Sequence, residues 1–180
     1  MILGLGTGHS GTRNIGLAGS GVAELAAGTA FIRQLLAGRP ATWQGAEAHL
    51  PWVHRKSPVF IAGSGPKALA AAGRTADGAF VNFGITAENL TQTEAAVIAG
   101  ARAVGRDPAE VEIWQIAALD CHRDGAASRQ RIGAILAFMA AGYILQGDLS
   151  ARGLPAELHG GVVELKRRYS TRPSNADAAL

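Results

Sequence analysis

The chain alternates between short apolar runs bounded by glycine or proline and longer stretches whose apolar residues recur at helical spacing. The clearest run is Pro58-Val59-Phe60-Ile61-Ala62, which leads into Gly63-Ser64-Gly65-Pro66 and then into an Ala/Leu-rich stretch. A continuous apolar run that ends in turn residues is typical of a strand buried on both faces, as in a parallel sheet. The pattern therefore predicts a strand over 58–62, a tight glycine turn and a helix over 66–75.

The same signals predict the remaining elements. We expect further strands at 1–5, 79–83 and 111–119, and further helices at 22–37, 86–104, 126–141 and 162–169. The stretches 12–20, 39–57 and 146–160 are expected to be irregular, and 170–180 a disordered tail. Asp107-Pro108-Ala109-Glu110 has the spacing of a capping box. Regular alternation of strand and helix indicates an α/β fold whose parallel strands are joined by right-handed crossovers.

The turn over 63–66 is the first candidate site. Ser64 is a good N-cap residue, and Pro66 suits the first turn of a helix. Gly63 and Gly65 remove side chains where the backbone turns sharply. A helix start with free N–H groups binds anions, and phosphate is the usual one. The alternative is that glycine and proline only punctuate a strand-to-helix turn.

A second glycine turn, Gly6-Thr7-Gly8-His9-Ser10-Gly11, follows strand 1–5. It matches the dinucleotide-binding fingerprint of an NAD(P)-dependent Rossmann-type dehydrogenase. That fold also needs a second strand ending in an acidic residue about 20 positions further on. Helix 22–37 is predicted there instead, so the dehydrogenase remains an alternative. A nucleophile elbow is disfavoured because Thr12 stands where that motif needs glycine.

Composition limits the function classes. Apolar residues make up 48% of the 180 residues and the net charge is +3, with no basic stripe interleaved with aromatic residues, so nucleic-acid binding is unsupported. A single cysteine, Cys121, excludes an intramolecular disulfide, and His49 and His54 lack a carboxylate at ligand spacing, so we expect no metal site. The apolar run 132–145 is shorter than the roughly 18 residues of a membrane span. Without a signal peptide at residue 1, we expect a cytoplasmic protein.

The two glycine turns belong to a longer series of motifs. The series continues through Leu50-Pro51-Trp52, Ala72-Gly73-Arg74, Ala76-Asp77-Gly78 and Gly105-Arg106-Asp107-Pro108. Together they resemble the bacterial luciferase-like superfamily of flavin- or deazaflavin-dependent oxidoreductases, in particular its methylenetetrahydromethanopterin reductase-like branch. The resemblance implies a (β/α)8 TIM barrel of which this chain holds about four βα units. Strands 1–5, 58–62, 79–83 and 111–119 would be barrel strands four to seven.

The resemblance also implies a site at the carboxyl ends of the strands, where barrel active sites lie. Gly63, Ser64, Gly65 and Pro66 would hold the phosphate of FMN or coenzyme F420 through backbone N–H groups. Thr7 and Gly8 would approach the cofactor ring or its ribityl chain. His9 is the candidate for a catalytic group in this turn, but it departs from the family pattern, which often has an acidic residue there and assigns the proton role to it.

The chain departs from the family in length, since a barrel of this type needs roughly 250 residues. No segment supplies strands one to three, and none is predicted as strand eight. We therefore expect residues 1–169 to be a barrel segment, truncated and inactive alone, that associates with a second copy or with a complementary half and acts on a small-molecule substrate. A non-catalytic oligomerising fragment is the other alternative. Cys121 and His122 follow strand 111–119 and could face the same rim, although an ordinary thiol and a solvated histidine are commoner there.

Overall fold

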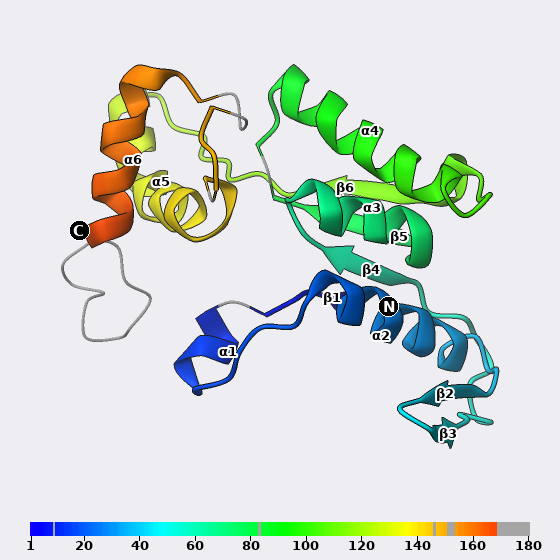
Figure 1. The fold of residues 1–180 in the computed structure, drawn as a ribbon. Coiled ribbons are helices and arrows are strands. Elements are labelled where there is room, and N and C mark those ends of the chain that lie inside the picture. Colours follow the sequence, from blue (N-terminus) through cyan, green and yellow to red (C-terminus); the bar gives the residue numbers. More distant parts are fainter. Residues whose placement is uncertain (9, 83, 146, 151–153, 169–180) are drawn as a thin grey trace. The chain divides into compact units, whose positions relative to one another are not determined.

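The computed structural model describes residues 1–8, 10–82, 84–145, 147–150 and 154–168 (Figure 1). The chain forms two compact units, Met1–Val81 with Ile85–Ile116, and Asn82–Gly84 with Ala117–Leu180. The elements of the first unit are β1 (Leu3–Leu5), α1 (Ser10–Asn14), α2 (Val22–Leu35), β2 (Ala41–Trp43), β3 (Ala46–Ala48), β4 (Val59–Ala62), α3 (Pro66–Thr75), β5 (Gly78–Val81), α4 (Ala87–Arg102), the 3-10 turn η1 (Pro108–Glu110) and β6 (Glu112–Gln115). The α/β class is confirmed.

The first unit is built on a four-stranded sheet in the order β1-β4-β5-β6. All three neighbouring pairs are parallel, with Leu5 beside Ile61, Ala62 beside Phe80, and Val81 beside Gln115. The strands follow one another across the sheet in chain order, with helices in the connections. Their carboxyl ends therefore meet at one edge, as predicted for parallel strands.

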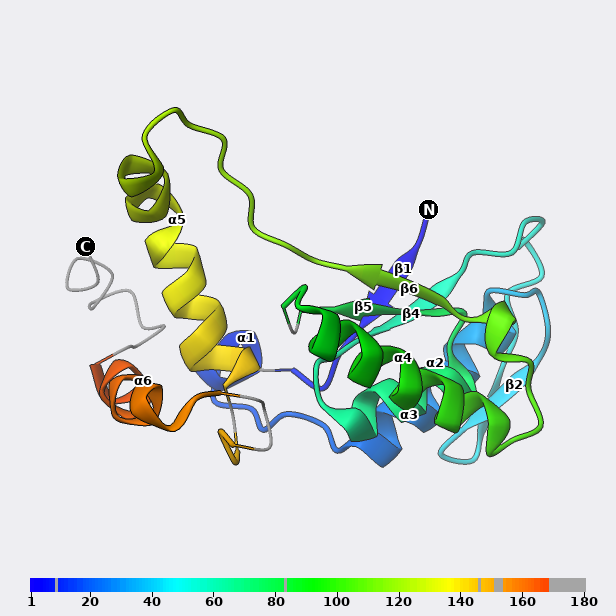
Figure 2. The same ribbon diagram turned by 90° about the horizontal axis from the view of Figure 1, so that it is seen from above.

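The three long helices α2, α3 and α4 cover one face of this sheet (Figure 2). Strand residues that alternate toward the helices are fully buried, including Val59, Ile61, Ala79 and Val81. Residues of the opposite alternation lie on a face that no helix of this unit covers. The helices thus bury a continuous apolar layer on one face, while the other face mixes glycine with aromatic residues, of which Phe60 is also buried.

Helices α3 and α4 approach closely because glycine occupies both sides of their contact. A Cβ placed on Gly73 would lie 2.1 Å from the carbonyl oxygen of Val97, and one on Gly100 would lie 2.0 Å from that of Ala70. Neither distance is possible for a real side chain, so both positions require glycine. The Ala-Gly-Arg part of the motif series is thus a packing feature.

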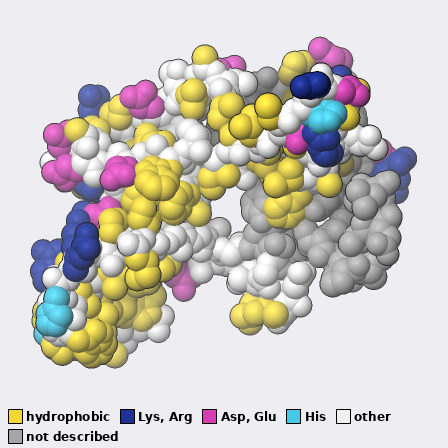
Figure 3. Space-filling model, turned by 180° about the vertical axis from the view of Figure 1, so that it is seen from behind, with side chains coloured by type: hydrophobic (Ala, Val, Ile, Leu, Met, Phe, Trp, Pro, Cys, Tyr) yellow, Lys and Arg dark blue, Asp and Glu magenta, His cyan; other side chains and the backbone are white. Residues whose placement is uncertain are grey.

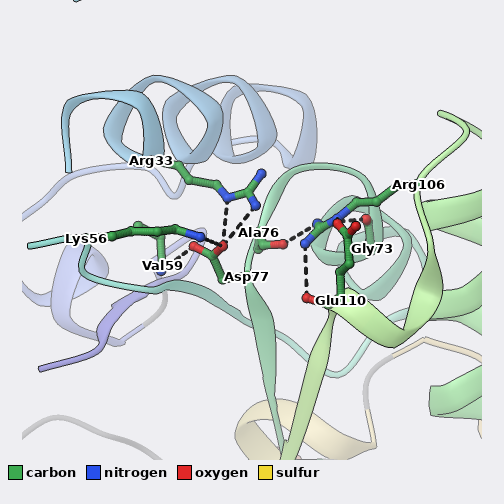
Figure 4. Close-up of polar contacts among 8 residues, drawn as sticks. All are labelled: Arg33, Lys56, Val59, Gly73, Ala76, Asp77, Arg106 and Glu110. Atoms are coloured by element: carbon green, nitrogen blue, oxygen red, sulfur yellow. Dashed lines mark hydrogen bonds and ion pairs between the residues drawn. The ribbon is translucent and has the colours of Figure 1, made fainter. Parts of the chain in front are cut away.

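The amino edge of the sheet holds a network of polar contacts (Figure 4). Asp77 Oδ1 accepts hydrogen bonds from Arg33 Nε and Lys56 Nζ, both at 2.9 Å, and Asp77 Oδ2 accepts one from the Val59 N–H at 3.0 Å. Arg106 donates to the carbonyl oxygens of Gly73, Ala76 and Glu110, and also pairs with the Glu110 carboxylate. The Ala-Asp-Gly and Gly-Arg-Asp-Pro motifs therefore tie loops together at the edge opposite the glycine turns.

Several element predictions are wrong in detail. Residues 12–20 include the end of α1, and the predicted connection 39–57 contains the antiparallel hairpin of β2 and β3. The hairpin turn, Gln44-Gly45, has positive φ at both residues, 49° and 84°. Strand 111–119 ends at Gln115, because β5 offers partners only as far as Val81.

The second unit contains α5 (Gly125–Met139), a π-helical turn (Ala140–Ile144) and α6 (Ala156–Arg168). Asp124 caps α5 by accepting the Ala126 N–H at 2.8 Å. The helix predicted over 162–169 begins earlier, at Ala156, so the expected irregular stretch 146–160 is shorter. Among the described helices, none has the length and apolar character needed to cross a membrane. The predicted tail 170–180 lies outside the described residues.

Candidate functional site

The two glycine turns lie next to each other at the carboxyl edge of the sheet. Strands β1 and β4 are parallel neighbours, so the turn over residues 6–8 and the turn over 63–66 leave the sheet side by side. A Cβ on Gly6 would be only 3.5 Å from the Ala62 carbonyl oxygen. Residues separated by more than fifty positions in the sequence thus form one backbone-lined surface at the edge where α/β folds bind ligands.

The turn after β4 leads directly into α3. The Gly63 N–H extends the ladder by donating to the Phe80 carbonyl oxygen at 3.0 Å. A Cβ on Gly63 would lie 2.8 Å from the Ala68 Cβ, so the tight turn needs glycine here. Pro66 is the first residue of α3, as predicted, but the N-cap is Gly65, whose backbone is extended at φ −91° and ψ 149°. The prediction of Ser64 as N-cap is therefore wrong by one residue.

Gly65 leaves open space above the start of α3. Apart from its chain neighbours, no residue has an atom within 4 Å of a Cβ built on Gly65. Because glycine has no side chain, the N-cap offers no side-chain acceptor to the first-turn N–H groups of α3. The first-turn N–H groups of an α-helix have no acceptor within the helix, and they carry the positive end of its dipole. This is the geometry in which an anionic group can approach the backbone closely.

Lys67, which sequence reasoning did not select, is the second residue of α3 and is exposed. The first turn of α3 contains no acidic residue. A cation at a helix N-terminus is placed against the helix dipole, which favours acidic residues there. This unfavourable placement of a lysine was the signal available in the sequence. An anion bound at the turn would make the lysine's positive charge favourable there.

The turn after β1 is held rigidly by the loop that follows it. The Ser20 N–H donates to the Thr7 carbonyl oxygen at 2.6 Å. A Cβ on Gly19 would lie 2.8 Å from the same oxygen, so this loop approaches as closely as glycine permits. Gly8 has φ +80°, and a Cβ there would lie 2.6 Å from Thr12 Cγ2. Thr7 and Gly8 are thus fixed beside the turn over 63–66. His9 lies outside the described residues.

Three aromatic rings cover the open face of the sheet. The Phe60 and Phe80 centroids are 4.9 Å apart, and Trp114 meets both rings edge-on at 5.7 Å. Phe60 is buried beneath the cluster, whereas Trp114 is 47% exposed. Sequence reasoning missed this cluster because the strand pattern alone does not show which face the helices leave open.

The remaining candidates from the sequence have local contacts of their own. His122 Nδ1 contacts the Asp124 backbone, and Cys121 is exposed, both in the second unit. His49 Nε2 contacts the Gly38 carbonyl oxygen at 3.2 Å. Within the described residues, no three His, Cys, Asp or Glu side chains are grouped as metal ligands would be.

The geometry also decides against the dinucleotide-binding alternative. The strand beside β1 is β4, which begins at Val59, and the positions about 20 residues after the glycine turn lie inside α2. The second parallel strand with its terminal acid is therefore replaced by helix in the described structure. The fingerprint after β1 is a glycine turn without the rest of the Rossmann unit.

Comparison with known proteins identifies the family. The family described as luciferase-like monooxygenase matches residues 1–179. The chain belongs to the luciferase-like monooxygenase family. The resemblance inferred from the glycine turns and the Ala-Asp-Gly series is thereby confirmed.

This chain is similar to two reductases. The 5,10-methylenetetrahydromethanopterin reductase of Methanolobus tindarius is 32% identical over 121 residues, which cover 63% of this chain and 36% of that protein. The solved structure of the coenzyme F420-dependent tetrahydromethanopterin reductase from Methanopyrus kandleri superimposes with a TM-score of 0.68 at 18% identity. That superposition covers 99% of this chain and 56% of the other chain. The matched part of this luciferase-like chain thus corresponds to 36% of the first relative and 56% of the second.

Proposed function

We propose that this luciferase-like chain holds the phosphate of coenzyme F420, or of FMN, on the turn over 63–66, as part of an oxidoreductase for a small-molecule substrate. The observation that supports the proposal is the open space above Gly65 at the start of α3, next to the turn of Thr7 and Gly8. The relatives named above, one described as F420-dependent, favour the deazaflavin, while the family as a whole also includes flavin-dependent members.

The residues present fit a phosphate-bearing cofactor. The first-turn N–H groups of α3 can donate to phosphate oxygens, and Lys67 would add a positive charge at the same helix end. The rigid turn of Thr7 and Gly8 would limit where the rest of the cofactor lies. When bound, such a cofactor supplies hydride transfer in the deazaflavin case or oxygen activation in the reduced-flavin case. The role of the chain is to bind, orient and exclude water; no proton-transfer role is assigned to His9.

The parallel sheet would correspond to strands four to seven of the family barrel. In the described structure β1 and β6 each pair with a single strand, and no helix of the first unit covers the sheet face that carries Phe60, Phe80 and Trp114. Unpaired edges and exposed apolar faces promote association. A second copy or a complementary half would close the sheet and complete the cofactor site. Sedimentation velocity tests this part: we expect oligomers or co-assembly, and a stable, active monomer would contradict it.

The absorbance spectrum of the purified chain tests the cofactor assignment. A band of bound deazaflavin or flavin, removed by denaturation and restored by adding F420 or FMN, is expected. A reduction assay on the same sample should show negligible turnover, because on this proposal precise placement of the reacting groups needs the complementary half of the barrel. Failure of both cofactors to bind would overturn the assignment. A cytoplasmic location remains a prediction.

A further inference from the structure

A pocket of about 300 Å³ at the amino edge of the sheet is lined by Arg33, Ala37, Arg39 and Lys56. Three of these four residues are cations, and none is acidic. The carboxylate of Asp77 contacts both Arg33 and Lys56 at 2.9 Å. Three positive charges thus converge where one negative charge is present, at the edge of the sheet opposite both glycine turns. Figure 3 shows Lys and Arg side chains on the side of the molecule that carries the β2–β3 hairpin.

The cations are held in place before any ligand arrives. Arg33 and Lys56 both donate hydrogen bonds to the same oxygen, Asp77 Oδ1, and this shared acceptor fixes the two side chains relative to each other. The Arg39 backbone is fixed by the turn after α2, where its N–H donates to the Gln34 carbonyl oxygen at 3.1 Å. The Ser57 N–H reaches the Leu36 carbonyl oxygen at 3.4 Å and so holds the Lys56 segment against the same turn.

The cations also keep unused donors. A guanidinium has five N–H groups and an ammonium has three, so the contacts to Asp77 leave several donors of Arg33 and Lys56 available. The Arg39 side chain makes no hydrogen bond or ion pair with any described residue. Because Arg33 is only 30% exposed, its charge is partly removed from water, which strengthens its interaction with an anion.

We infer that this pocket is a second anion site, which binds the dianionic phosphate group of a small phosphorylated molecule or of inorganic phosphate. A tetrahedral dianion would balance the two excess positive charges, and arginine donors match its oxygens in pairs. The inference does not depend on the proposed cofactor site, which lies at the opposite edge of the sheet.

The test is an NMR titration of the full chain with potassium phosphate at pH 7.5, with potassium chloride at matched ionic strength as the reference. The Arg33 Nε–H signal should shift saturably with phosphate, with half-saturation on the order of 1 mM. Arg39→Gln should raise that concentration about tenfold, the effect of one charge-assisted hydrogen bond. The control Arg102→Gln removes the same charge from an exposed position on α4 and should leave it unchanged.

A chain carrying Gly65→Val separates the two sites. The Arg33 titration should be the same in this background, since the substitution affects only the opposite edge. Shifts no larger with phosphate than with chloride would overturn the inference. Equal effects of Arg39→Gln and Arg102→Gln would do the same, because binding would then follow net charge alone.

Discussion

Arg33 on α2 donates its Nε–H to Asp77 Oδ1 over 2.9 Å, although the two residues are 44 positions apart in the sequence. With Lys56 and the Val59 N–H, this contact joins α2, the loop before β4 and the start of β5 through one carboxylate. The Ala-Asp-Gly motif, which helped to identify the family, is therefore a structural element at the edge of the sheet remote from the candidate cofactor site.

Asp77→Asn should destabilise the first unit by about 2–3 kcal/mol, because Arg33 and Lys56 lose their counter-charge in a partly buried place. Urea unfolding followed by tryptophan fluorescence measures the change. Glu94→Gln removes an exposed carboxylate from α4 and should change the free energy of unfolding by less than about 0.5 kcal/mol. A similarly small effect of Asp77→Asn would show that the network contributes little.

The same carboxylate predicts a pH dependence. Burial alone would raise the pKa of Asp77, but the hydrogen bonds from Arg33, Lys56 and the Val59 N–H outweigh it and lower the pKa from 3.8 to about 2. Because the pKa of Asp77 is lower in the folded state than in the unfolded state, its carboxylate stabilises the fold at pH values above the unfolded-state pKa. This stabilisation is lost as the pH falls toward the folded-state pKa. The stability difference between the unsubstituted chain and Asp77→Asn should thus shrink by about 2 kcal/mol between pH 5 and pH 2. A constant difference would contradict this assignment.

Gly73→Ala and Gly100→Ala should each destabilise the protein by about 2 kcal/mol or more, since the added methyl group meets backbone of the facing helix. Chemical denaturation measures both. Gly161→Ala in α6 is the matched control: nothing lies within 4 Å of its Cβ, so it should be neutral or stabilising by up to about 1 kcal/mol. Tolerance of alanine at position 73 or 100 would mean that α3 and α4 are less tightly packed than described.

The unsubstituted chain should not bind NADH, because α2 occupies the place of the second Rossmann strand. Quenching of tryptophan fluorescence on addition of NADH measures this. Saturable quenching, abolished by Gly6→Ala and Gly8→Ala, would restore the dehydrogenase alternative.

The sequence predicted most of this fold because the decisive signals are local. The apolar run before Gly63 and the proline at position 66 define β4 and the start of α3 without reference to the rest of the chain. The start of α4 is likewise local, because Thr86 Oγ1 accepts the Asn89 N–H at 3.2 Å. Signals of this kind depend on a few neighbouring residues.

Features that depend on distant partners were missed. The apolar run 111–119 does not reveal that β5 ends at Val81, so β6 was predicted too long. The hairpin of β2 and β3 has strands of three residues each, too short for a periodic pattern. Likewise, the aromatic cluster depends on which face of the sheet the helices cover, and the pocket at Arg39 depends on where α2 packs. No local pattern specifies either arrangement.

The central claim is that the start of α3 holds the cofactor phosphate, and a comparison of Gly65→Val with Gly21→Val tests it most directly. Both glycines are helix N-caps with extended backbone and no atom within 4 Å of a built Cβ, so the two variants should lose similar, small amounts of stability. In fluorescence titrations with F420 and with FMN, Gly65→Val should raise the dissociation constant at least about tenfold, because a side chain would block close approach to the N–H groups. Gly21→Val should change it less than about twofold. Equal losses in the two variants, or no saturable binding of either cofactor by the unsubstituted chain, would contradict the account.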